Sequence, residues 1–352
     1  MAKSVDSPRS AGLRVQHRLP TRGIAFRKTG VVTATRVLLD TNVWNYIVEV
    51  DGVEPLRKAA RANRVAIVAC PAVVYECLRV ADPDKRKHRA KALAREDWLR
   101  LMPEAFSEAE DVRREMQRLR PGWLLDTPDL RQWSRHRADW QSGFWRRVRR
   151  EPGVVAGHIK ALGDDRLRQA RDATKAARKQ GESLGHTIHT FKWNRATGTF
   201  AVPTPGWDGS EFEAWRGLSV SCWWNDLILG ESPTTLEWLG PWLDLRAVRS
   251  DIAPWTRLWT REVETSALPR EWIRWAMAET QATRTTSNGT PGDNQLATYL
   301  VDVDIFVTTD KVFVDLADAM RPHCPAPLAE TRRSPAGSEA LTFVLELLQS
   351  LS

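Results

Sequence analysis

Four acidic residues stand at positions from which they could hold a metal ion. Each lies at the edge of a segment that the sequence predicts to be a strand or a helix, and they are Asp40, Glu76, Asp293 and Asp310. Carboxylates gathered within a few ångströms repel one another, so some of them stay protonated unless a cation neutralises them. Mg²⁺ and Mn²⁺ both prefer oxygen ligands. If the four converge, they predict a divalent-metal site that activates water and stabilises charge on a phosphate.

The segments around the first two acids have the pattern of an open α/β sheet. Val37–Leu39 is an apolar run that ends at Asp40, as a buried parallel strand does, and residues 65–69 form a second such run. Residues 43–62 between them read as helical. Pro71 then opens a helix that carries Glu76, because proline is tolerated in a first helical turn. Ligands bind at the carboxyl ends of parallel strands. Asp40 lies at such an end, and the helix could deliver Glu76 nearby.

The same pattern returns near the end of the chain. Asp293 opens a predicted helix that reaches Val301, and Asp310 follows a predicted strand over 305–308. A further helix is expected over 311–320. Asp302 and Asp304 directly precede the strand. Either could supply an extra metal ligand, but a helix-end or loop role fits them better.

The sequences around the four acids resemble the motifs of PIN-domain ribonucleases. Leu38–Asn42 (LLDTN) is similar to the opening motif, and Pro71–Glu76 (PAVVYE) to the second. Asp293–Leu300 (DNQLATYL) looks like the third motif, and Thr308–Phe313 (TTDKVF) like the fourth. The motifs follow one another in the family's order, and the third and fourth acids are 17 positions apart.

The resemblance implies a fold, a cofactor and a reaction. The fold would be an α/β/α sandwich around a parallel sheet, and the reaction would be hydrolysis of RNA phosphodiester bonds with Mg²⁺ or Mn²⁺. Asp40, Glu76, Asp293 and Asp310 would be both catalytic residues and metal ligands. Thr41, Asn42 and Thr308 would support them through hydrogen bonds.

Residues 98–288, here called the insertion, depart from the small toxins of that family. They contain sixteen of the seventeen tryptophans. The pairs Trp238/Trp242 and Trp255/Trp259 are four positions apart, so each pair lies on one helix face and predicts core packing. We therefore expect a mainly helical insertion that gates or selects substrate, with a loop or hairpin over 192–209. A basic helix over 166–179 offers candidate nucleic-acid contacts at Arg166, Arg168, Arg171, Lys175 and Arg178.

The predicted organisation has four parts. Residues 1–35 form a basic, flexible tail, with an organelle transit peptide as the alternative. Residues 36–97 and 289–320 form the PIN-like core, interrupted by the insertion. Residues 321–352 form a Pro-rich linker and a C-terminal helix. Residues 1–36 carry eight Lys and Arg against one acid, which accounts for seven of the eight net positive charges.

The charge, cysteine content and apolar runs of the chain limit the classes of binding partner that we expect. A net charge of +8 and a pI near 9.6 favour a polyanion such as RNA, although an indifferent basic surface would look the same. The four cysteines form no recognisable disulfide or zinc pattern, which fits a reducing cytoplasm. No apolar run approaches the roughly 20 residues that span a bilayer, so no membrane partner is expected.

The leading hypothesis is therefore a metal-dependent endoribonuclease acting as a toxin or in RNA processing or defence. An antitoxin, another protein or a second copy of the chain remains open as a partner. Two alternatives differ in class. One is a catalytically inactive PIN-fold scaffold that binds nucleic acid, and the other is a structure-specific DNA nuclease. Loss of an acid would favour the scaffold, but all four are present.

Overall fold

A computed structural model describes residues 34–161, 193–230, 233–282 and 290–352, together with positions 172, 175, 176 and 179. Residues 34–352 belong to one compact unit. The predicted tail over 1–35 lies outside the described residues except for its last two positions. Most of the predicted basic helix also lies outside them, including Arg166, Arg168, Arg171 and Arg178. Lys175 is described, and it is helical and exposed.

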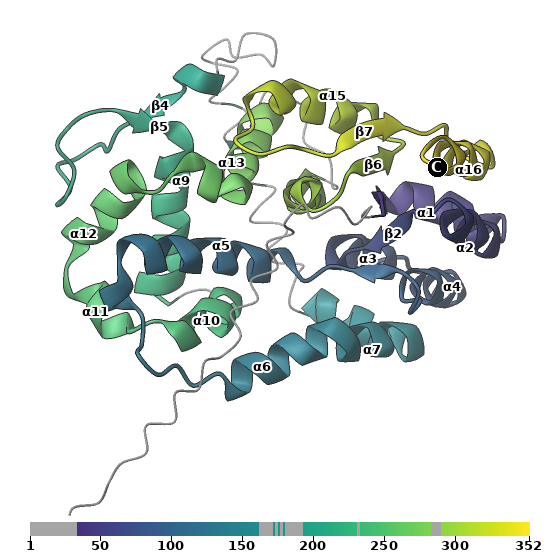
Figure 1. Ribbon diagram of the computed structural model, residues 1–352, viewed down its shortest axis with the longest axis horizontal. Coiled ribbons are helices and arrows are strands. Elements are labelled where there is room, and N and C mark those ends of the chain that lie inside the picture. Colours follow the sequence, from purple (N-terminus) through teal and green to yellow (C-terminus); the bar gives the residue numbers. More distant parts are fainter. Residues whose placement is uncertain are drawn as a thin grey trace, which may run out of the picture. The chain divides into compact units, whose positions relative to one another are not determined.

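In the described part of the chain, five strands form one parallel sheet in the order β3-β2-β1-β6-β7 (Figure 1). Leu39 of β1 pairs with Val307 of β6, and Leu38 pairs with Val68 of β2. The strands are β1 (Arg36–Leu39), β2 (Ala66–Ala69), β3 (Leu99–Arg100), β6 (Ile305–Thr308) and β7 (Glu330–Arg333). The α/β class is thus confirmed.

Helices connect the strands and pack against the sheet. Because parallel crossovers are right-handed, the connections from β1 to β3 and the connection from β6 to β7 place their helices on opposite faces. Helix α16 packs with α1 and α2, while α15 packs on β6 and β7. The elements are α1 (Thr41–Glu49), α2 (Val53–Ala62), α3 (Pro71–Leu78), α4 (Pro83–Leu93), α14 (Thr290–Ala297), η8 (Thr298–Val301), α15 (Lys311–Met320), η9 (Arg321–His323) and α16 (Glu339–Ser350).

Three details of the sheet region differ from the sequence analysis. The single helix expected over 43–62 is two helices, because Asp51 adopts a left-handed φ of 52° and Gly52 follows it. A Cβ at Gly52 would lie 3.0 Å from the carbonyl oxygen of Ile47, which favours glycine there. Strand β3 falls just after residue 97. The Pro-rich segment also contributes β7, whose polar sequence carries no apolar strand signal.

The described part of the insertion is mainly helical, as expected. Eleven of its sixteen tryptophans are buried, and their rings belong to the same core cluster as the sheet. The segment expected to be a loop or hairpin over 192–209 is mostly loop; its short strand β4 pairs antiparallel with β5, which lies just beyond the predicted range. After β3, the described elements of the insertion are α5 (Glu104–Leu119), η1 (Pro121–Trp123), α6 (Arg131–Ala138), η2 (Asp139–Gly143), α7 (Phe144–Arg150), a helix over 152–161, η3 (Trp193–Arg195), β4 (Thr197–Gly198), β5 (Phe212–Glu213), α9 (Ala214–Trp223), η4 (Trp224–Ile228), α10 (Pro233–Leu239), η5 (Gly240–Trp242), α11 (Leu245–Ser250), α12 (Ile252–Arg257), η6 (Leu258–Glu262), η7 (Thr265–Ala267) and α13 (Pro269–Ala282).

A buried carboxylate ties two helices of the insertion together. Glu271 of α13 accepts hydrogen bonds from the Ser219 hydroxyl at 2.7 Å and from the Trp223 indole N–H at 3.0 Å, both on α9. All three residues are buried. Since buried polar groups need partners, this contact fixes the register of α9 against α13.

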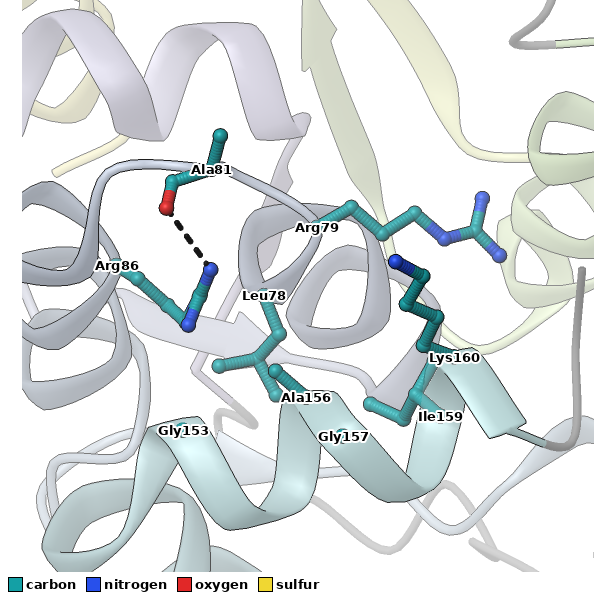
Figure 2. A pocket seen from close by; sticks show the side chains of 9 residues that line it. All are labelled: Leu78, Arg79, Ala81, Arg86, Gly153, Ala156, Gly157, Ile159 and Lys160. Atoms are coloured by element: carbon teal, nitrogen blue, oxygen red, sulfur yellow. Dashed lines mark hydrogen bonds between the residues drawn. The ribbon is translucent and has the colours of Figure 1, made fainter.

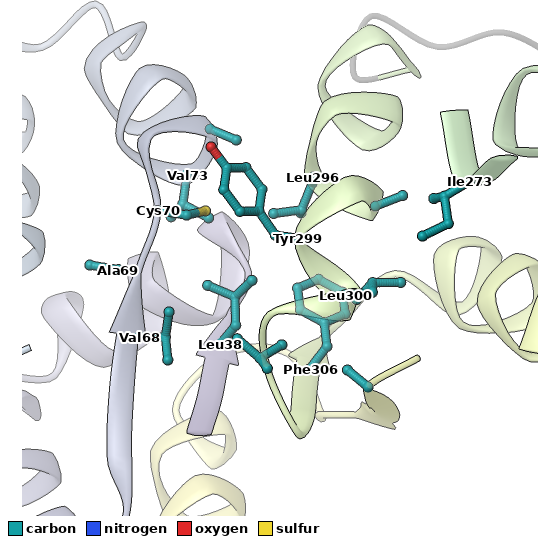
Figure 3. Packing of buried hydrophobic residues seen from close by; sticks show 14 of the residues in the cluster. Leu38, Val68, Ala69, Cys70, Val73, Ile273, Leu296, Tyr299, Leu300 and Phe306 are labelled. Atoms are coloured by element: carbon teal, nitrogen blue, oxygen red, sulfur yellow. The ribbon is translucent and has the colours of Figure 1, made fainter. Parts of the chain in front are cut away.

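After α13, the last helix of the insertion, α14 and η8 lead the chain back to the sheet. Helix α14 packs against α3, so the segment that carries Asp293 lies beside the helix that carries Glu76. Figure 3 shows Leu296 and Tyr299 pointing toward Cys70 and Val73 across this contact. None of the helices in the described ranges combines the length and apolar character that crossing a membrane requires.

Candidate active site

Asp40 and Asp310 follow the two adjacent strands at which the strand order of the sheet reverses. From β1 the chain moves to β2 and β3 on one side, whereas β6 and β7 lie on the other side of β1. Asp40 directly follows β1, and Asp310 lies two residues after β6. The two acids therefore occupy the carboxyl ends of the two strands at the topological switch point, where open α/β sheets bind their ligands.

Asp40 is buried and held by two hydrogen bonds. Its Oδ1 accepts from the Thr41 backbone N–H at 2.6 Å, and its Oδ2 accepts from the Thr308 hydroxyl at 2.7 Å. Each carboxylate oxygen has a second lone pair, which leaves Asp40 able to accept further contacts. Burial raises the pKa of Asp40 to about 6; the Thr308 bond opposes this rise, whereas the negative charges of Glu76 and Asp310 add to it.

Glu76 joins this group through Thr41. The Thr41 hydroxyl donates to Glu76 Oε2 at 2.8 Å, while the backbone N–H of Thr41 serves Asp40. Thr41 is buried and Glu76 is exposed, so the carboxylate reaches the site from its solvent side. The threonine of the first motif thus connects the first two acids.

Asp293 lies in the same electrostatic neighbourhood although 217 positions separate it from Glu76. It occupies the first turn of α14, as expected. Burial and, to a smaller extent, the negative charges of Asp310, Asp40 and Glu76 together raise its pKa to about 8. All four acids are therefore close enough to influence one another.

Asp310 also has a structural role. Its Oδ1 caps α15 by accepting from the Val312 backbone N–H at 2.7 Å and from the Phe313 N–H at 3.4 Å. Its own backbone N–H donates to the Thr308 hydroxyl at 3.0 Å. The cap places the carboxylate at the start of the helix, where a negative charge is stabilised.

The remaining predicted residues divide clearly. Thr308 supports the site as expected. Asn42 is exposed in the first turn of α1, and among the described residues its side chain makes no hydrogen bond. Asp304 pairs with Arg36 at 3.0 Å and Asp302 pairs with Arg270 at 2.6 Å. Both acids precede β6, at the edge opposite Asp310, so their role is structural.

One residue missed by the sequence analysis positions the third motif. Glu104, in the first turn of α5, accepts a hydrogen bond from the Gln295 side chain and another from the buried Tyr299 hydroxyl at 3.1 Å. Gln295 lies two positions after Asp293 on α14. No local signal could reveal this contact, because 191 positions separate Glu104 from Gln295.

The donor set fits a hard divalent cation in its chemistry. All four side chains offer carboxylate oxygens. Burial and neighbouring carboxylates raise the pKa values of Asp40 and Asp293. Over the described ranges, no group of three or more acidic, His or Cys side chains is yet gathered tightly enough to hold an ion. The four carboxylates therefore influence one another electrostatically without forming a closed coordination shell.

Comparison of the chain with family models, with curated proteins and with solved structures finds no match. Function must therefore be inferred from the residues and their geometry.

Proposed function

We propose that this protein is a Mg²⁺- or Mn²⁺-dependent endoribonuclease with a PIN-like fold. The observation that carries the proposal is a chain of hydrogen bonds at the carboxyl edge of the sheet, which runs from Glu76 through Thr41, Asp40 and Thr308 to the backbone N–H of Asp310. Helix α14, which carries Asp293, packs against α3, which carries Glu76. The charges of the other three acids also contribute to the raised pKa of Asp293, which agrees with a shared site. A cluster of this kind destabilises the fold unless a cation neutralises it, and function is the usual reason for keeping such a cluster.

In this proposal the four carboxylates hold the metal, which supplies an activated water and stabilises charge on the phosphate when it is bound. The protein contributes orientation. Thr308 keeps Asp40 and the start of α15 in register, and Thr41 keeps Glu76 beside Asp40. Glu104 holds α14, the helix that carries Asp293, through its hydrogen bond from Gln295.

The biological setting follows from the same proposal. The basic composition suits a polyanionic substrate, and the buried thiols of Cys70 and Cys77 suit a reducing cytoplasm. Roles as a toxin, in RNA processing or in defence all use this reaction. An antitoxin or another protein partner would then act by covering the acidic edge.

The test is cleavage of end-labelled RNA and DNA of mixed sequence with Mn²⁺ or Mg²⁺, with and without EDTA. We expect RNA cleavage that EDTA abolishes and that Asp40→Asn removes. Asp304→Asn is the matched control, because Asp304 flanks the other end of β6 and forms only an exposed ion pair. Cleavage of DNA alone would change the substrate class. No cleavage by the parent protein under any metal would favour the scaffold alternative.

A further inference from the structure

A cavity lies next to the helix that carries Glu76. Its volume is about 470 Å³, and it opens between the end of α3, the following loop and the helix over 152–161 (Figure 2). A volume of this size is within the roughly 300–1,000 Å³ of small-ligand sites. The cavity is separate from the four acids, and its lining residues are Leu78, Arg79, Ala81, Arg86, Gly153, Ala156, Gly157, Ile159 and Lys160.

Two cations at the cavity are available to a ligand. Arg79 and Lys160 are exposed, and neither forms an ion pair with any residue that the structure describes. Figure 2 shows the Lys160 amine beside the Arg79 side chain, whose guanidinium extends further outward. Two neighbouring positive charges attract an anion more strongly than either does alone. By contrast, Arg86 donates to the Val80 and Ala81 carbonyls at 2.9 and 3.1 Å, so it fixes the rim.

The opposite wall is smooth and apolar. Gly153 and Gly157 are four positions apart on one helix face, and a Cβ at either would meet nothing within 4 Å. Leu78, Ala156 and Ile159 supply apolar surface around this open face. A flat ring can approach such a wall closely, while its attached anion reaches the cations.

The geometry points to a nucleotide subsite in which Arg79 and Lys160 bind a phosphate of a single-stranded RNA substrate and the apolar wall receives the adjacent base. Arg79 is the cap residue that ends α3, and Glu76 lies one helical turn before it. A strand held here would continue toward the acidic edge. This inference rests on the proposed function for its choice of RNA. Two exposed cations beside an apolar wall suit a nucleotide better than an acidic peptide, which lacks planar bases.

The test measures binding without cleavage. A 5′-fluorescein-labelled single-stranded RNA of 12 nucleotides is titrated with the full chain in EDTA across a salt series. We expect Arg79→Gln/Lys160→Gln to weaken binding on the order of ten-fold and to lower the salt slope by about 0.7 per lost phosphate contact. Lys87→Gln/Lys91→Gln is the matched control, because it removes the same charge from exposed positions on α4 outside the cavity.

A second variant tests the wall independently of charge. Gly157→Met places a long side chain in the open space while favouring the helix, so the protein should fold and RNA binding should fall about as far as in the charge variant. Gly157→Ala should bind RNA nearly as the parent does. The subsite is refuted if Arg79→Gln/Lys160→Gln or Gly157→Met binds RNA like the parent. It is also refuted if Lys87→Gln/Lys91→Gln weakens binding as much as Arg79→Gln/Lys160→Gln does. A parent that binds no RNA in EDTA would refute it as well.

The two proposals fail in distinguishable ways. Cavity-dependent RNA binding by a protein that cuts nothing would support the subsite and refute the nuclease. Metal-dependent cleavage that survives intact in the Arg79→Gln/Lys160→Gln variant, with unchanged binding, would refute the subsite alone. Tighter binding of a poly-glutamate peptide than of RNA would assign the cavity to an acidic protein and overturn the nucleotide assignment.

Discussion

The Thr308 hydroxyl donates a 2.7 Å hydrogen bond to Asp40 Oδ2 across the two central strands. The same oxygen accepts the Asp310 backbone N–H at 3.0 Å. One buried hydroxyl therefore connects the acid after β1 with the acid after β6. It also links the end of the sheet to the start of α15, because Asp310 caps that helix.

Replacing Thr308 with Val should separate these contacts at almost constant volume. Asp40 then keeps a buried charge without its side-chain donor, so its pKa should rise above about 6. The free energy of unfolding at pH 8 should fall by about 1–3 kcal/mol. At pH 5 the loss should be smaller, because Asp40 is mostly protonated in the folded state and the lost bond to the carboxylate matters less.

Urea unfolding at the two pH values measures this difference. Thr308→Ser keeps the hydroxyl and is the control, with a loss well below that of Val. Equal losses for Val and Ser at pH 8 would mean that the hydroxyl is not the important group.

Asp293→Asn should stabilise the metal-free protein. The folded-state pKa of Asp293 is about 8, against an ordinary value of 3.8. Between these values the folded protein retains a proton that the unfolded chain releases, so the free energy of unfolding of the parent falls as pH rises from about 4 to 8. The variant lacks this fall and should be more stable at pH 8 by on the order of 2 kcal/mol.

Thermal melting in EDTA from pH 5 to pH 8 tests this prediction, and the advantage of the variant should shrink toward pH 5. Adding Mn²⁺ at pH 8 should raise the melting temperature of the parent more than that of the variant, because binding to the folded state stabilises it. A variant that is less stable than the parent at pH 8 would show that the acids are not mutually destabilising.

Local sequence could predict the elements near the acids, because their signals are local. The apolar run before Asp40, the proline that opens α3 and the strand before Asp310 each define an element within a few residues. Convergence of Asp293 with the others did not follow from such signals. It was expected only from the order of the motifs, and the structure brings the segment back through the packing of α14 against α3.

Other features depend on contacts that no local pattern reveals. Strand β7 has the polar sequence ETRR, and it joins the sheet because β6 offers it an edge. The break between α1 and α2 depends on the left-handed backbone of Asp51. Arg79 and Lys160 line one cavity although 81 positions separate them, so no local pattern in the sequence predicts this cavity.

Glu104→Ala should loosen α14 while leaving the sheet intact. The substitution removes the acceptor for Gln295 and one acceptor for the buried Tyr299 hydroxyl, which retains the Met102 carbonyl at 3.2 Å. We expect a loss of about 1–2 kcal/mol in the free energy of unfolding. Amide exchange in α14 should accelerate more than in α1, and RNA cleavage should fall because Asp293 is no longer held.

The control variant is Glu110→Ala, because Glu110 lies on the same helix and pairs with Arg113. It should change the free energy of unfolding by less than about 1 kcal/mol and leave amide exchange in α14 unchanged.

Glu271→Ala should show that the insertion and the sheet unfold together. The change leaves the Ser219 hydroxyl and the Trp223 indole N–H buried without their acceptor, at a cost of about 2–4 kcal/mol. Residues 34–352 form one compact unit with a continuous core, so this loss should lower the midpoint of a single unfolding transition.

The measurement must follow the sheet and the insertion separately. Far-ultraviolet circular dichroism reports mainly the helices. The fluorescence of Trp44, on α1 beside the sheet, can be isolated only by replacing other tryptophans. A simpler probe is amide exchange in β1 and α13, which should accelerate together in the variant. Glu271→Gln keeps one acceptor and should cost less. Faster exchange in α13 with unchanged exchange in β1 would instead mean that the insertion opens on its own.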